Sequence, residues 1–236
     1  MTRAPARATV WSALRLAMAA AILTAIIAQF AKTLATATEL GRDVPTTVAN
    51  FFSFFTILSN VGAAVVLVWA AVWFWMRGRR DAAASEPRSL ALTLACASTY
   101  MVVTGIVYNT LLRGIPLPQG SEPIPWSNEI LHLVGPLFLL LDVLVGPARR
   151  CLGWRAVLAV DAFPIVWVVY TLVRAPLTTD PVSHDPWWYP YPFLNPHVQP
   201  WGHGGVALYV VVIAVVITVV AAGVVWVGRR RGRPAR

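Results

Sequence analysis

The run HGGVALYVVVIAVVITVVAAGVVWV at residues 203–227 contains no Asp, Glu, Lys or Arg. A helix rises about 1.5 Å per residue, so a helix of this length crosses the roughly 30 Å hydrocarbon core of a bilayer. Arginines follow at 229–231, and a basic flank of this kind is typical of the cytoplasmic side. The run therefore predicts a transmembrane helix that ends in the cytoplasm.

The whole chain has the composition of a membrane protein. Of its 236 residues, 58% are hydrophobic and 12% are charged, against roughly 45–50% and 25% in soluble domains. A soluble domain of this length keeps a large polar surface, so this composition excludes one. Five further apolar runs lie at 10–35, 48–76, 89–113, 127–146 and 152–174. The expected fold class is all-α: a polytopic membrane protein whose six transmembrane helices form one bundle domain over residues 1–236.

The first run, 10–35, has two interpretations. It follows Arg3 and Arg7 and ends near small residues, which is also the pattern of a cleaved signal peptide. We favour a retained helix, because the apolar stretch is long enough to span the membrane. A cleaved signal remains the alternative.

Basic residues predict the orientation of the six spans. Fifteen of the 19 Lys and Arg residues fall at the start of the first span, in or beside the second and fourth linkers, or after the last span. They are Arg3, Arg7, Arg15, Arg77, Arg79, Arg80, Arg88, Arg149, Arg150, Arg155, Arg229, Arg230, Arg231, Arg233 and Arg236. Lys32, Arg42, Arg113 and Arg174 fall on the other side. The positive-inside rule therefore places both termini in the cytoplasm, with the protein in the cell membrane (plasma or inner).

The net charge of +9 follows mainly from this topology. The basic residues are not clustered with stacking aromatic residues, as a nucleic-acid surface requires, so nucleic acid is not an expected partner. Basic residues at the inner surface attract anionic headgroups. The expected partners are membrane lipids.

The fifth linker, 175–202, is the longest external segment and contains seven prolines among Trp, Tyr and Phe residues. Proline at this density prevents helix formation, and Trp and Tyr favour the headgroup layer. We expect this outer cap to lie on the membrane. An aromatic anchor and a lid over a site are both open interpretations.

Polar side chains inside the spans are costly in lipid and point to partners or to function. The second span contains NFFSFFTILSN (50–60), where Ser53, Thr56 and Asn60 share one face at intervals of three and four. The third span ends near Asn109, and the fourth opens with Asn128 and His132. Thr56, Asn109 and His132 are expected to lie at similar depth, in the outer half of the bilayer.

These residue types suit nucleophilic acyl transfer. Thr56 supplies a hydroxyl nucleophile, His132 a base, and the amides of Asn60, Asn109 and Asn128 donors for substrate or an oxyanion. Residues of the same types in spans often form only interhelical hydrogen bonds, and that alternative stays open.

Glu129 precedes His132 by three residues and is expected to orient the imidazole or to raise its basicity. An E-x-x-H step also occurs in di-iron bundles, but the second copy that such a site needs is missing. Cys96 and Cys151 make neither a disulfide framework nor a zinc site. We therefore expect no metal and no cofactor, and Asp142 and Asp161 are interpreted first as structural.

Three stretches resemble a known family: NFFSFFTILSN (50–60), SNEILHLVGPLFLLLD (127–142) and DPWWYPYPFLNP (185–196). They look similar to the androgen-induced-protein type of integral membrane hydrolase and to its bacterial six-helix relatives. The resemblance implies a catalytic threonine in the second span and a histidine in the fourth, acting on fatty acid esters of hydroxy fatty acids. Thr56 and His132 match this pair, and Asp142 matches an acidic residue at the end of the same span.

The leading functional hypothesis is a Thr/His-dependent hydrolase of lipid esters with its site in the outer leaflet. A non-enzymatic membrane protein that binds a lipid or a protein partner is the alternative. A small carrier is a third hypothesis, which rests on Asp142 and Asp161 and is weakened by the absence of internal repeats.

Overall fold

The computed structural model describes residues 6–81, 84–147 and 150–232, and in these residues it contains helices and no strand. Six of the described helices are long and apolar enough to cross a membrane. They are α1 (Ala6–Glu39), α3 with η1 (Phe55–Gly78), α4 with η2 (Arg88–Leu112), α5 with η3 and α6 (Pro125–Leu144), α7 with η4 (Arg155–Leu177) and α8 (His203–Arg231). The six expected long apolar helices are confirmed, which is consistent with a multi-pass membrane protein.

The second span differs from the expected continuous helix over 48–76. The structure has a short helix α2 (Val44–Phe51), then an irregular turn, then α3 (Phe55–Trp73). Asp43 caps α2 by accepting a hydrogen bond from Thr46 N, and Pro45 occupies its first turn. The break removes Ser53 from the helical face of Thr56 and Asn60, so the expected three-residue face is wrong.

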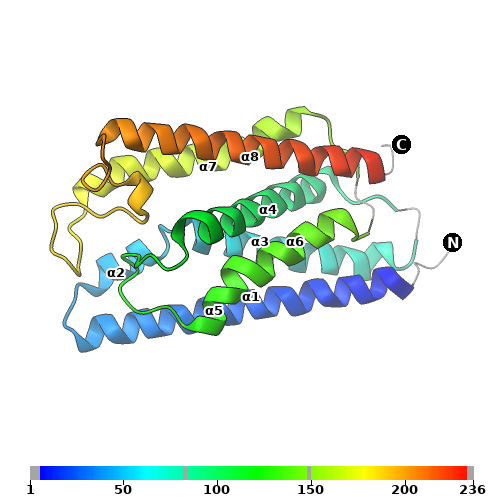
Figure 1. Cartoon of the computed structure of the whole chain (residues 1–236). Helices are drawn as coiled ribbons and strands as arrows, with labels where there is room; N and C mark the ends of the chain where they lie inside the picture. The colour runs from blue at the N-terminus through cyan, green and yellow to red at the C-terminus, as the bar shows by residue number, and fades with distance from the viewer. Residues whose placement is uncertain (1–5, 82–83, 148–149, 233–236) are drawn as a thin grey trace.

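The helix α4 (Arg88–Val107) lies at the centre of the bundle, between α3 and α6 on one side and α7 and α8 on the other (Figure 1). Leu90, Leu94 and Met101 on α4 are fully buried. Small residues such as Ala91 and Ala95 let its neighbours approach closely, as is usual in membrane bundles. The helix α4 thus contacts four of the other spans, while α1 packs mainly on α3 and on the span that contains α5 and α6.

The outermost helices expose apolar side chains over much of their length. On α7 (Arg155–Arg174) these include Val166 and Val173, and on α8 they include Val211 and Val219. In water such a surface would be unfavourable, whereas in hydrocarbon it needs no cover. These faces are therefore expected to contact lipid.

The first described turn of α1 and the last turn of α8 lie at the same end of the bundle (Figure 1). Both donate hydrogen bonds to the carboxyl end of α6 (Gly135–Leu144): Arg7 Nη2 to Val145 O at 2.6 Å and Arg231 Nη2 to Gly146 O at 2.8 Å. Cations at a helix carboxyl terminus satisfy its free carbonyls. Of the basic set that predicts the orientation, Arg3, Arg149, Arg233 and Arg236 lie outside the described residues.

Asp142 forms a buried ion pair in the same half of the molecule. Arg15 donates to both carboxylate oxygens, at 2.9 and 3.1 Å, and Trp11 Nε1 also donates to Oδ1. The exposed fractions of the Arg15 and Asp142 side chains are 6% and 0%. Asp142 therefore joins α1 to α6, in agreement with its structural interpretation.

The outer cap packs into the end of the bundle and does not simply lie on it. Trp188, Tyr191 and Leu194 are buried, and the rings of Trp188 and Tyr191 both pack edge-on against Phe54. Trp188 N donates to Ala175 O in η4 (Ala175–Leu177). The cap also contains the short turn η5 (Pro192–Leu194), and it contributes side chains to the interior.

Candidate functional site

Thr56 lies in the first turn of α3 because the chain breaks at 52–54. Ser53 Oγ donates back to Ala49 O at 2.7 Å, and Trp167 Nε1 on α7 donates to Ser53 O at 3.0 Å. These bonds satisfy polar groups that a continuous helix would satisfy internally. The break leaves the first N–H groups of α3 without partners inside the helix.

Tyr191 from the outer cap reaches this helix end. Its Oη accepts a hydrogen bond from Thr56 N at 3.2 Å and lies 3.3 Å from Thr56 Oγ1. Burial raises the pKa of Tyr191, so the phenol keeps its proton. Since Oη already accepts from the backbone, its own proton can go to Thr56 Oγ1, which leaves the threonine proton free for a base.

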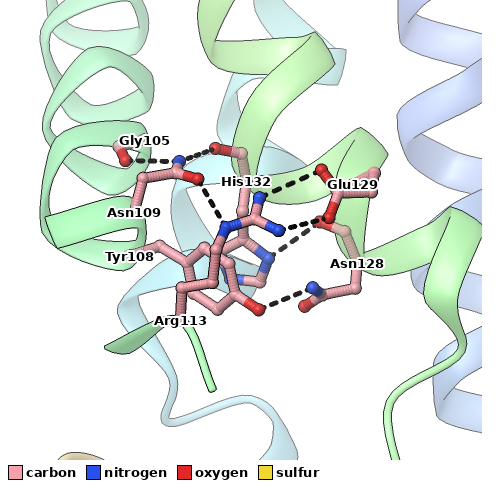
Figure 2. A network of polar contacts seen from close by, with 7 residues as sticks. All are labelled: Gly105, Tyr108, Asn109, Arg113, Asn128, Glu129 and His132. Atoms are coloured by element: carbon pink, nitrogen blue, oxygen red, sulfur yellow. Dashed lines mark hydrogen bonds and ion pairs between the residues drawn. The ribbon is translucent and has the colours of Figure 1, made fainter. Parts of the chain in front are cut away.

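His132 lies in the π-helical segment η3 (Ile130–Val134), and a single acceptor fixes its tautomer. Nδ1 is 2.9 Å from Asn128 O, and a carbonyl oxygen only accepts, so Nδ1 carries the proton. Nε2 then presents a lone pair, as a general base requires. The ring stacks on Tyr108, with centroids 3.8 Å apart (Figure 2).

A second π-helical segment, η2 (Tyr108–Leu112), faces η3 across the gap between α4 and α6. Asn109 Nδ2 donates to Gly105 O at 2.8 Å and to His132 O at 3.0 Å (Figure 2). A π-helical turn shifts the backbone bonding pattern by one residue and often marks a functional site. Asn109 therefore ties the two irregular turns together.

A glycine permits this close approach of the two helices. A Cβ on Gly105 would lie 2.8 Å from Pro136 Cβ, which is closer than real contacts allow. Any larger residue at this position would push α4 away from α6. The contact between Asn109 and His132 O depends on this crossing.

Asn60 links the turn of Thr56 to that of His132. It is fully buried, and its Nδ2 donates to Thr56 O at 2.9 Å and to Leu131 O at 3.2 Å. Asn128 Nδ2 donates instead to Tyr108 Oη at 2.6 Å. Asn60 and Asn109 thus use both amide protons on backbone carbonyls, whereas Asn128 uses one on Tyr108 and has a second at the lining of the cavity described below.

Glu129 bonds Arg113, and the carboxylate does not orient the imidazole in this structure. Arg113 donates to the two carboxylate oxygens at 2.8 and 3.0 Å and to Asn109 Oδ1 at 2.9 Å (Figure 2). Both ends of this ion pair are exposed. The partner that orients His132 is the Asn128 carbonyl.

Thr56 and His132 line the same cavity, which has a volume of about 310 Å³ and is here called the polar cavity. Tyr108 and Asn128 also line it, together with the polar residues Gln29, Gln119, Ser121 and Glu122. A second cavity of about 210 Å³, the apolar cavity, lies between α3, α4, α7, α8 and η5. Thr56 and Tyr108 line both cavities, so they lie where the two adjoin.

Tyr191 and Arg113 contribute to the site, although sequence reasoning did not select them. Tyr191 belongs to the stretch DPWWYPYPFLNP, one of the three on which the family resemblance rests, and this is the sequence feature that could have identified it as a site residue. Nothing in the sequence connects Arg113 with Glu129. Asp161, interpreted as structural, lines the apolar cavity.

No group of three or more His, Cys, Asp and Glu residues in the described part of the chain could hold a metal ion. Comparisons of the chain with protein-family models, with curated proteins and with solved structures found no match.

Proposed function

We propose that this protein is an integral membrane hydrolase of lipid esters, with Thr56 as nucleophile and His132 as base. It resides in the cell membrane with both termini cytoplasmic, it uses no cofactor, and its site lies in the outer leaflet. The observation that carries the proposal is the polar cavity, which both side chains line, together with the fixed tautomer that presents a lone pair on His132 Nε2.

The reaction follows from these groups. Thr56 Oγ1 attacks the ester carbonyl carbon as its proton passes to His132 Nε2, and the imidazolium then protonates the departing alkoxide. Water, deprotonated by the same imidazole, attacks the acyl-threonine and releases the acid. The donors beside Thr56 for the oxyanion are the Tyr191 hydroxyl, which would have to turn its proton away from Thr56 Oγ1, and the Thr56 N–H, which bonds Tyr191 Oη in this structure.

The cavities match the parts of a lipid ester. The polar cavity suits the ester group and water, and the apolar cavity beside Thr56 suits a hydrocarbon chain. In this structure Thr56 Oγ1 bonds Tyr191, and the proposal requires it to bond Nε2 when substrate is present. Catalytic hydrogen bonds often tighten only in the substrate complex.

A non-enzymatic lipid-binding protein is the second candidate. It is favoured by the hydrogen bond between Thr56 and Tyr191, because a packing role for Thr56 needs no more than this bond. In that case the polar side chains of both cavities would only hold the bundle together.

The test is cleavage of long-chain esters by purified protein in detergent. Thr56→Ala and His132→Ala are expected to abolish cleavage while the protein remains folded, and Thr56→Ser is expected to keep part of it. Thr99→Ala is the matched control, because Thr99 is a buried threonine on α4 outside both cavities. Wild-type protein that cleaves no ester tested, or Thr56→Ala protein as active as the Thr99→Ala control, would contradict the proposal.

A further inference from the structure

Asp161 on α7 is a membrane-embedded carboxylate without a cationic partner. The described residues place no Lys or Arg within ion-pair distance of it, whereas Asp142 has Arg15. Its Oδ1 is buried and has no hydrogen-bond partner. Asp142 and Asp161 therefore have different environments: Asp142 is paired with a cation, and Asp161 is not paired with one among the described residues.

Among the described residues one side chain donates to Asp161, and its proton is shared. Thr218 Oγ1 lies 3.3 Å from Asp161 Oδ2 and 2.9 Å from Ala214 O, yet a hydroxyl has a single proton. When that proton goes to Ala214 O, the carboxylate receives no hydrogen bond from Thr218. An ionised carboxylate in apolar surroundings is strongly unfavourable unless it is paired. A cationic ligand with hydrogen-bond donors would supply the pairing that the described residues do not give Asp161.

Asp161 and Thr218 line one end of the apolar cavity, and Tyr191, Phe193 and Leu194 line the other. The lining of α8 extends from Val210 to Thr218, which corresponds to roughly 12 Å of helix. Its walls are apolar side chains such as Val107, Pro164, Ile213 and Ile217. The cavity is thus long and apolar, with one acidic group at its inner end.

The cavity also borders the lipid-facing surface. Ile165 on α7 lines the cavity and is nevertheless 57% exposed. A ligand dissolved in the bilayer therefore meets the cavity at its lateral wall, without passing through the outer cap.

We propose that the apolar cavity binds a single-chain aliphatic amine in its protonated form. The ammonium group lies against Asp161 and supplies the missing charge and donors, and the alkyl chain extends toward Tyr191. A fatty acid of the same length would bring a second negative charge to Asp161, and a fatty alcohol would bring one donor and no charge. This binding requires no hydrolysis and does not involve His132, although the amine occupies the cavity that the hydrolase proposal assigns to the hydrocarbon chain of the ester.

The experiment measures saturable binding of radiolabelled dodecylamine to the full-length protein in phosphatidylcholine nanodiscs. Empty nanodiscs correct for partition into lipid. Asp161→Asn keeps the side-chain shape and removes the charge, and it is expected to weaken binding by about tenfold or more. Asp185→Asn, which changes a carboxylate of the outer cap, is the matched control and is expected to bind as wild type. Unlabelled dodecanol and dodecanoate are expected to compete poorly.

A second variant tests the position of the chain and leaves Asp161 in place. Val210→Phe fills the outer end of the cavity, so it is expected to weaken binding of dodecylamine but not of hexylamine, which is too short to reach that end. Equal dodecylamine affinity in wild type and Asp161→Asn would overturn the proposal. So would equal competition by dodecanol, or a Val210→Phe variant that binds both amines as wild type does.

Discussion

The side chain of Tyr191 joins the outer cap to the first turn of α3. Its ring stacks on Phe193, with centroids 5.1 Å apart, and its hydroxyl meets both the N–H and the hydroxyl of Thr56. The substitution Tyr191→Phe therefore separates the packing of the ring from the hydrogen bonds of the hydroxyl, because phenylalanine keeps the ring and lacks only the oxygen.

Tyr191→Phe is expected to lower the free energy of unfolding by about 1 kcal/mol, the usual contribution of a buried hydrogen bond. If the phenol also stabilises the oxyanion, ester cleavage is expected to fall by about 10²-fold or more. Denaturation and ester assays measure the two effects. Tyr189→Phe is the control, and a Tyr191→Phe protein that cleaves esters at the wild-type rate would remove Tyr191 from the mechanism.

The same tyrosine predicts an alkaline limit of stability. Burial raises the pKa of Tyr191 above its ordinary value of 10.0, so the unfolded chain releases this proton more readily than the folded one. The stability that the protonated phenol of Tyr191 gives to the folded state is fully present below about pH 10, and it is lost as the pH rises further. The unfolding temperature of the wild type is therefore expected to fall more steeply above pH 10 than the unfolding temperature of Tyr191→Phe. Parallel pH profiles would contradict this assignment.

At the scale of elements, the π-helical segments η2 and η3 hold the candidate site, and they depend on the close crossing of α4 and α6. Gly105 is the residue that permits the crossing, because of its distance from Pro136. Asn109 then bridges the two segments. The geometry of the site is therefore set by a packing contact outside its reacting groups.

Gly105→Ala tests this dependence. Alanine favours a helix over glycine by about 1 kcal/mol, so propensity alone predicts stabilisation. The close contact with Pro136 predicts the opposite: loss of stability and of ester cleavage, measured by thermal unfolding and activity. Gly62→Ala is the control, because a Cβ there meets nothing within 4 Å. A Gly105→Ala protein that is as stable and as active as Gly62→Ala would show that the crossing is not tight.

The ion pair between α1 and α6 gives a second prediction at this scale. Arg15→Met leaves the Asp142 carboxylate buried without its cation, which typically costs about 3–5 kcal/mol. The double variant Arg15→Met with Asp142→Leu removes both charges and is expected to recover much of that loss. Thermal unfolding in detergent measures both. If the double variant is no more stable than Arg15→Met, the unpaired Asp142 carboxylate is not the cause of the lost stability.

Elements that depend on local sequence were predictable, and those that depend on distant contacts were not. Long apolar runs located all six spans. The break at 52–54 was missed because NFFSFFTILSN contains no proline or glycine, and the bond from Trp167 to Ser53 O comes from a distant helix. The pairing of Glu129 with Arg113 likewise joins two different spans. Thr56 and His132 line one cavity as their expected depths suggest, but their roles remain a prediction.

At the scale of the whole molecule, basic residues gather at the end where α1 begins and α8 ends. Arg7 and Arg231 bond the carboxyl end of α6 there. The outer cap closes the opposite end of the bundle (Figure 1). This polarity, together with the distribution of arginine along the chain, supports cytoplasmic termini.

Reporter fusions test the orientation. A reporter fused after Arg236 is expected to be active in the cytoplasm, and one inserted near Asp180 is expected to be active outside, because the positive-inside rule assigns these segments to opposite faces. Cell fractionation with a sided protease provides the control for expression. Finding both reporters on the same side of the membrane would rule out the six-span topology.

The central claim, that Thr56 is a nucleophile activated by His132, is tested most directly by locating a covalent adduct. Purified protein is treated with a fluorophosphonate probe, digested, and analysed by peptide mass spectrometry. The predicted result is a phosphonyl group on Thr56 in wild type and none in His132→Ala, because the hydroxyl reacts only when a base accepts its proton. The contradicting result is wild-type protein with no adduct, an adduct on a different residue, or labelling of Thr56 that persists without His132.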